Sequence, residues 1–195
     1  MIVWAYCGEA WRRATAGATG ISPVASPPVT AATLTWPEKR PDVAVFNLHG
    51  DQYGQSAWHG QAANGERPTA VTVQQARAYD WQGCVVFSMV CWSAWGGGQE
   101  MARAFLDGGA LAFIGSTTEA YGRMRPVRFW ERWLGQSEKA DGLLRLFLAA
   151  YARHPGQPEK ALTLAKRWFR RHSWPLDEAD RMTLDSFVCL RGDKR

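Results

Sequence analysis

Three short apolar runs constrain the fold of this chain more than any other feature of its sequence. They cover residues 43–48, 85–90 and 110–115, and none of them contains a charged side chain. Apolar runs of this length, bounded by glycine or turn residues, are typical of strands buried on both faces, as in a parallel sheet. Strand and helix patterns alternate from residue 43 to 115, which predicts right-handed crossovers and a mostly parallel sheet.

The segments around these runs are predicted to complete an α/β domain. Thr72 and Gln75 have capping-box spacing, which predicts a helix that continues to Tyr79. The remaining predicted elements are strands over residues 2–7 and 186–190, and helices over 9–16, 99–107, 126–134, from about 143 until before Pro155, and from Pro158 onward.

Length and composition indicate a single globular domain spanning residues 1–195. The hydrophobic content is 46% and the charged content is 21%, both ordinary for such a domain. Residues 17–33 are rich in Ala, Thr, Gly, Ser and Pro, so we expect an irregular loop there that is too short to separate domains.

Charge and cysteine usage exclude several classes of protein. The formal charge is only +5, and its basic side chains fall largely on predicted helices, so we interpret them as a solvated face rather than a nucleic-acid site. The four cysteines have neither paired metal spacing nor a disulfide-dense pattern, so we expect no metal and no cofactor. No run reaches the eighteen or so apolar residues of a membrane helix, and no basic leader is visible. We therefore expect a cytoplasmic protein without membrane contact.

A histidine and a cysteine follow two of the apolar runs. His49 ends the first run and Cys91 ends the second. If the two strands are parallel neighbours, they lie roughly 4.8 Å apart, and the two side chains come within reach of each other. An imidazole beside a thiol is the minimum requirement for nucleophilic catalysis by cysteine. The alternative interpretation is that Cys91 is packing and that His49 with Gly50 is a turn.

The chain resembles caspase-fold (clan CD) cysteine peptidases of the gingipain and CHAT (separase-related) type. The resemblance covers about residues 43 to 193 and rests on four segments in the family's order. These are a strand ending in His49-Gly50, a strand ending in Cys91, residues 104–117, which are similar to the gingipain "GAxAxIGS" segment, and the helix 161–168 paired with the ending 187–193. The chain departs from the gingipain pattern at Lys194, where proline is usual, and its first 40 residues lie outside the resemblance.

This resemblance implies a fold, an activity and a set of catalytic groups. The fold is a caspase-like three-layer sandwich with a mostly parallel central sheet and helices on both faces. Cys91 corresponds to the nucleophile and His49 to the general acid, and the backbone N–H groups of Gly50 and Cys91 correspond to the oxyanion hole. The implied activity is that of a cysteine endopeptidase, with a protein or peptide as substrate.

Other residues are weaker candidates for contacts with a substrate. Trp58 and Trp92 could line the cleft, although tryptophans in a chain with 11 of them also serve as core or rim. Ser116 and Glu119 follow the third run and could border the substrate pocket. Asp51 is one of the acidic residues that would select Arg or Lys, and basic candidates that would select Asp are present too.

Two further functions stay open at this stage. One is a catalytically silent caspase-like module that binds a regulatory or sensor protein. The other is a glutamine amidotransferase or hydrolase with a cysteine elbow, which requires glycines on both sides of the nucleophile. Met89 and Ser93 occupy those positions, and His49 precedes the cysteine instead of following it, so this alternative ranks lowest.

Overall fold

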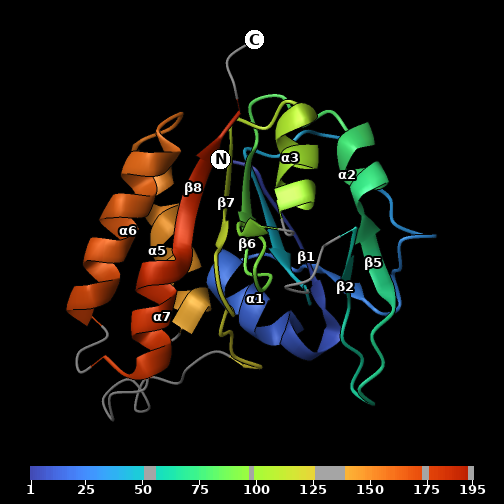
Figure 1. Cartoon of the computed structure of the whole chain (residues 1–195), viewed down its shortest axis with the longest axis horizontal. Coiled ribbons are helices and arrows are strands. Elements are labelled where there is room, and N and C mark those ends of the chain that lie inside the picture. Colours follow the sequence, from blue (N-terminus) through green and yellow to red (C-terminus); the bar gives the residue numbers. More distant parts are fainter. Residues whose placement is uncertain (51–55, 97–98, 126–138, 173–175, 193–195) are drawn as a thin grey trace.

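A six-stranded sheet forms the centre of the molecule in the computed structural model, which describes residues 1–50, 56–96, 99–125, 139–172 and 176–192. Its strands are β1 (Val3–Gly8), β2 (Val24–Ser26), β3 (Val43–Asn47), β6 (Val85–Ser88), β7 (Ala112–Ser116) and β8 (Phe187–Arg191). They are arranged in the order β2-β1-β3-β6-β7-β8, and all pairs are parallel except β7 with β8 (Figure 1). The mostly parallel sheet predicted from the apolar runs is therefore confirmed.

Helices cover both faces of this sheet (Figure 1). One face packs against α1 (Arg12–Thr19), α5 (Lys139–Arg153), α6 (Pro158–His172) and α7 (Glu178–Ser186). The other face packs against α2 (Val73–Ala78), α3 (Gln99–Asp107) and the small antiparallel pair β4 (Ala57–His59) and β5 (Thr69–Thr72). A 3-10 turn, η1 (Glu9–Trp11), precedes α1. This arrangement confirms a three-layer α/β sandwich.

Alternating side chains of the central strands separate two hydrophobic cores. In β3, Val43 and Val45 pack on the α5 side, whereas Ala44 and Phe46 pack on the α3 side. Every residue of β3, β6 and β7 is buried, which explains why these strands lack a polar face in the sequence.

The structure confirms some local predictions and corrects others. The Thr72–Gln75 capping box forms as expected and begins α2. The segment 17–33, expected to be an irregular loop, contains the end of α1 and the strand β2, because Val24 to Ser26 pair with the outer edge of β1. The sequence interpretation missed α7, which begins with a capping box between Asp177 and Asp180. The helix predicted over 126–134 lies outside the described residues.

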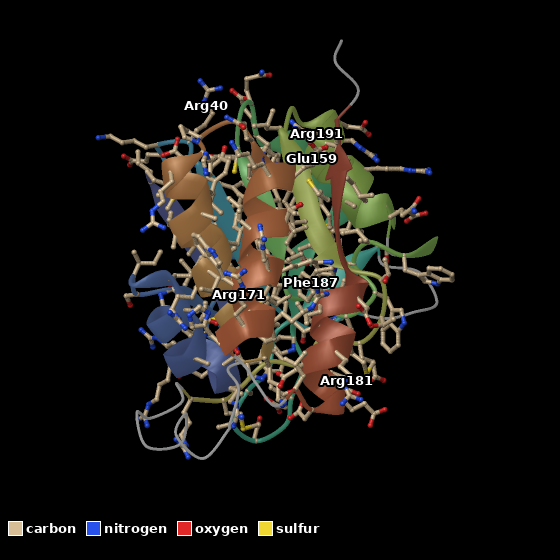
Figure 2. All side chains as sticks on the ribbon, turned by 90° about the vertical axis from the view of Figure 1, so that its left-hand side faces the viewer. Arg40, Glu159, Arg171, Arg181, Phe187 and Arg191 are labelled. Carbon is tan, nitrogen blue, oxygen red and sulfur yellow. The ribbon has the colours of Figure 1, made fainter. Side chains whose placement is uncertain are left out.

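The helices α6 and α7 expose several arginine side chains. Arg167, Arg170 and Arg171 are exposed on α6, and Arg171 and Arg181 are visible on this face in Figure 2. At the end of β8, Arg191 binds Glu159 through two hydrogen bonds of 2.8 Å each.

No helix within the described ranges combines the length and apolar character that a bilayer span requires.

Trp58 is a core residue, which corrects its assignment to a substrate cleft. Its side chain is fully buried in the hydrophobic core on the α3 side of the sheet. The ring centroid lies 5.3 Å from that of Phe46, 5.6 Å from that of Phe105 and 6.3 Å from that of Phe113. A side chain enclosed by three other aromatic rings cannot contact a substrate.

We therefore expect Trp58→Ala to lower the free energy of unfolding by about 3–5 kcal/mol, because it leaves a large cavity in a closely packed layer. Urea unfolding at constant pH measures this loss. Trp95→Ala is the matched control, since Trp95 is 58% exposed, and it should change stability by less than about 0.5 kcal/mol. Equal losses for the two variants would contradict the core assignment.

Candidate active site

His49 and Cys91 follow the carboxyl ends of two paired strands, β3 and β6. Val43 lies opposite Val85 and Phe46 lies opposite Ser88, so paired residues differ by 42 in number. The N–H of Met89 donates to the carbonyl oxygen of Phe46 at 2.7 Å, which continues the pairing beyond the last strand residue. His49 and Cys91 differ by the same 42 positions and both follow the carboxyl ends of these strands. In open α/β sheets this edge is where ligands bind.

His49 is half-buried and held by several contacts. Its backbone exchanges two hydrogen bonds with that of His59, at 2.8 and 3.0 Å. Its Nε2 lies 2.5 Å from Oε1 of Gln61, and its ring centroid lies 4.6 Å from that of Trp11 in an edge-to-face arrangement. Burial lowers the pKa of His49 below its ordinary value. The hydrogen bond that His49 donates to Gln61 opposes this, and the charges of Arg67 and His59 add to the lowering. The imidazole is therefore neutral at neutral pH.

The Cys91 sulfur contacts the backbone of the segment that follows β7. The N–H of Ala120 donates to Sγ at 3.3 Å, and Sγ lies 3.8 Å from the carbonyl oxygen of the same residue. Burial raises the pKa of the Cys91 thiol; the Ala120 backbone and the charge of Arg67 oppose this, whereas Glu119 adds to it. Arg67 thus acts electrostatically on both Cys91 and His49. The thiol is neutral in the resting protein.

The chain turns sharply immediately after Cys91. Trp92 adopts a left-handed backbone conformation with φ 52°, which is unfavourable for a residue with a Cβ atom. The N–H of Trp92 donates to the carbonyl oxygen of Thr118 at 2.7 Å, and that of Ala94 donates to Ser116 at 2.9 Å. These two bonds fasten the strained turn to the end of β7, the neighbouring strand.

The other predicted substrate residues are distributed differently. Glu119 is exposed and Trp92 is half-buried. Trp92 bonds to Thr118, and Ala120, which follows Glu119, bonds to the Cys91 sulfur, so both residues lie at this edge. Ser116 is fully buried, and its hydroxyl bonds to Ser186 at 3.0 Å, so it cannot line a substrate pocket as expected. Asp51 lies outside the described residues.

Asp141, in the first turn of α5, was missed by the sequence interpretation. Its side chain is 6% exposed, its Oδ2 accepts the Arg123 N–H at 2.8 Å, and its Oδ1 has no hydrogen-bond partner among the described residues. A Cβ atom on Gly122 would lie 3.5 Å from Asp141 Oδ2 and 4.0 Å from the amide oxygen of Asn47, the last residue of β3. The carboxyl group therefore lies beside the end of the strand that leads to His49. Burial raises its pKa to about 6.

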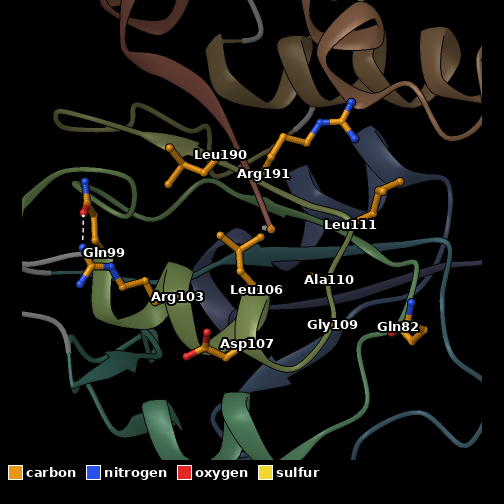
Figure 3. Close-up of a pocket in the computed structure, with 11 residues that line it drawn as sticks. Gln82, Gln99, Arg103, Leu106, Asp107, Gly109, Ala110, Leu111, Leu190 and Arg191 are labelled. Carbon is orange, nitrogen blue, oxygen red and sulfur yellow. Dashed lines mark hydrogen bonds between the residues drawn. The ribbon is translucent and has the colours of Figure 1, made fainter. Parts of the chain in front are cut away.

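A pocket of about 800 Å³ lies at the opposite edge of the sheet, so it is separate from this site (Figure 3). It is bounded by the end of α3, the residues that enter β7 and the end of β8, including Leu106, Leu111 and Arg191. Within the described ranges, no group of His, Cys, Asp and Glu could hold a metal ion.

Comparisons with known proteins give little guidance. No protein-family model matches this chain, and no curated protein matches it. A solved structure described as "Structure of Protease" is similar over 98% of this chain, with 13% sequence identity and a TM-score of 0.46. The chain spans 47% of that protein's length. A likeness at this level is too weak to support a shared activity, so the resemblance to caspase-fold peptidases stays a prediction.

Asp141 should make the protein less stable as the pH rises. Its folded-state pKa of about 6 exceeds the ordinary value of 3.8, so its contribution to stability is complete below about pH 4 and is lost as the pH rises through about 6. We expect Asp141→Asn to gain stability relative to the wild type between pH 5 and pH 8, by at most about 3 kcal/mol. Urea unfolding at several pH values measures the difference. Asp80→Asn, which removes an exposed carboxylate, is the control and should not show this trend.

Proposed function

We propose that this chain is a cytoplasmic cysteine endopeptidase that cleaves a protein substrate with His49 and Cys91. The observation that carries the proposal is the common register of β3 and β6, which supports a histidine and a cysteine side by side at one sheet edge. The strained turn at Trp92 adds support, because such backbone outliers gather at functional sites.

The neutral resting state of both groups favours proton transfer during attack over a preformed ion pair. In this mechanism, Cys91 Sγ attacks the carbonyl carbon of the scissile bond while its proton passes to the imidazole of His49. The imidazolium then donates that proton to the departing amine, and water hydrolyses the resulting thioester. The N–H groups of Gly50 and Cys91 would stabilise the oxyanion, a contribution worth roughly 10²–10³ in rate per donor in other enzymes. Glycine at position 50 leaves room for the substrate because it lacks a Cβ atom.

Asp141 supports a preference for substrates with Arg or Lys before the cleaved bond. Its Oδ1 is buried and lacks a hydrogen-bond partner in the part of the chain that the structure describes, and a buried carboxylate in this state gains most from a cationic group. Glu119, which is exposed in the segment leading from β7, adds negative charge near Cys91. A guanidinium that reached this group would bind Oδ1, while Oδ2 keeps the Arg123 N–H.

The second candidate function is a catalytically silent module that binds a regulatory or sensor protein. The partial burial of Cys91 and its raised pKa favour this function, because a reactive cysteine usually has a lowered pKa. The two functions predict different outcomes when the thiol is challenged directly.

Cys91→Ala should abolish both peptide cleavage and labelling by a chloromethyl ketone with a peptide group. Mass spectrometry of the labelled protein and of a digested peptide library provides both measurements. Cys189→Ala is the control, since Cys189 is a partly buried thiol on the edge strand β8, and it should keep full activity and labelling. Labelling that persists in Cys91→Ala would refute the peptidase, whereas labelling without cleavage at any pH would favour the silent module.

Asp141→Asn should reduce kcat/KM for peptides with Arg or Lys at the cleavage position by roughly 10- to 100-fold, because a hydrogen bond to a charged group is lost. Paired peptides that differ only in having Arg or norleucine at that position measure the effect. The norleucine peptide is the control and should be affected much less. An equal loss with both peptides would show that Asp141 does not select the substrate.

A further inference from the structure

The amide of Gln61 has a defined orientation toward the imidazole of His49. Its Oε1 lies 2.5 Å from Nε2 of His49, and its Nε2 donates to the carbonyl oxygen of Ala62 at 3.2 Å. Reversing the amide would point its oxygen at a carbonyl oxygen, so the Ala62 contact determines which end faces the ring. An oxygen that can only accept a hydrogen bond requires a proton on Nε2 of His49.

The backbone of Gln61 is held on both sides of this amide. Its N–H donates to the carbonyl oxygen of Ser26 at the end of β2 at 3.0 Å. Its carbonyl oxygen accepts the N–H of Ala10 in the turn after β1 at 3.1 Å. The backbone of Gln61 is therefore anchored to β2 and to the turn that follows β1, independently of the contact that its side chain makes with His49.

Space for this arrangement depends on Gly8 at the end of β1. A Cβ atom on Gly8 would lie 2.8 Å from Cε3 of Trp11 and 2.9 Å from the backbone nitrogen of Gln61. Its φ of −63° is open to any residue, so this position suits glycine because of space rather than conformation. Trp11 packs edge-to-face on the imidazole of His49. The missing side chain of Gly8 therefore leaves space for both Trp11 and Gln61 beside that ring.

We propose that Gln61 is a positioning residue, which holds His49 in the tautomer with hydrogen on Nε2 and leaves Nδ1 to exchange a proton with Cys91. This inference rests on the proposed function for the role of Nδ1, but the tautomer itself does not depend on it. The proton of the thiol passes to Nδ1 during attack, and the same proton leaves Nδ1 for the amine, while Nε2–H stays bonded to Gln61. The imidazolium formed between these two steps keeps a hydrogen-bond acceptor for its second N–H.

The charged groups around His49 make Gln61 important for this step. Arg67 and His59 both disfavour the imidazolium, and burial disfavours it further. The hydrogen bond to Gln61 favours the imidazolium, because Nε2 stays protonated in that form. Without this acceptor, His49 should be a weaker base toward the thiol.

Nitrogen-detected NMR of the full chain labelled with 15N-histidine tests the inference without a substrate. The wild type should show His49 with hydrogen on Nε2, and His49→Asn identifies the signal. Gln61→Leu should lower the pKa of His49 and Gln61→Glu should raise it, each by about one unit, because the acceptor is removed in one and made anionic in the other. Gln82→Leu, an exposed glutamine at the opposite sheet edge, is the control and should leave the titration unchanged.

Two outcomes would overturn the proposal: hydrogen on Nδ1 in the wild type, or an unchanged His49 titration in both Gln61 variants. Gln61→Asn keeps the amide but is too short to reach the ring, so it should resemble Gln61→Leu and provides a second test if the leucine variant does not fold. The pH dependence of Cys91 alkylation by iodoacetamide separates the two proposals. If the His49 titration shifts but the alkylation rate does not, the positioning by Gln61 holds and the His49–Cys91 pair of the proposed function fails.

Discussion

The parallel hydrogen-bonded pairing of β3 with β6 is the constraint on which the site depends. It brings together two segments that are 42 residues apart and delivers both to one edge of the sheet. The register cannot slip easily, because both strands are buried on both faces. A shift of one residue would exchange the side chains of the two cores, placing Phe46 among the residues that pack on α5. The hydrophobic core therefore determines the register of the two strands that lead to His49 and Cys91.

Several unfavourable features of the structure gather at this same edge. Trp92 has a left-handed backbone conformation, and Asp141 buries a carboxyl oxygen that no described residue bonds. Each lowers stability, and neither is required by the packing of the two cores. Proteins tolerate such features mainly where they serve activity, because consistent local choices elsewhere compensate for them. Their position at the carboxyl end of the strand pair is what makes this edge the candidate site.

The sequence was sufficient for the central strands but not for the side chains around them. Buried parallel strands need continuous apolar residues, so β3, β6 and β7 were visible as runs, and the Thr72 capping box was visible by its spacing. Trp58 was misassigned because its strand β4 has only three residues, too few to show a strand pattern in the sequence. Ser116 was misassigned because its partner Ser186 is 70 residues away. Asp141 had a usable signal, since it precedes the apolar positions Leu143 and Leu144 of a buried helix and is itself enclosed.

The unequal composition of the two cores has a consequence for spectroscopy. Trp58 and Trp81 are enclosed on the α3 side of the sheet, with Trp4 and Trp36 packed beside them, whereas the α5 side is mainly aliphatic and phenylalanine-rich, with Trp168 at its margin. The emission of buried indoles shifts when water reaches them. Changes in the emission of the buried, described tryptophans will therefore report on loosening of the α3 layer, while far-ultraviolet circular dichroism will follow the long helices of the other. A difference between the two signals during denaturation would show that the layers come apart at different points.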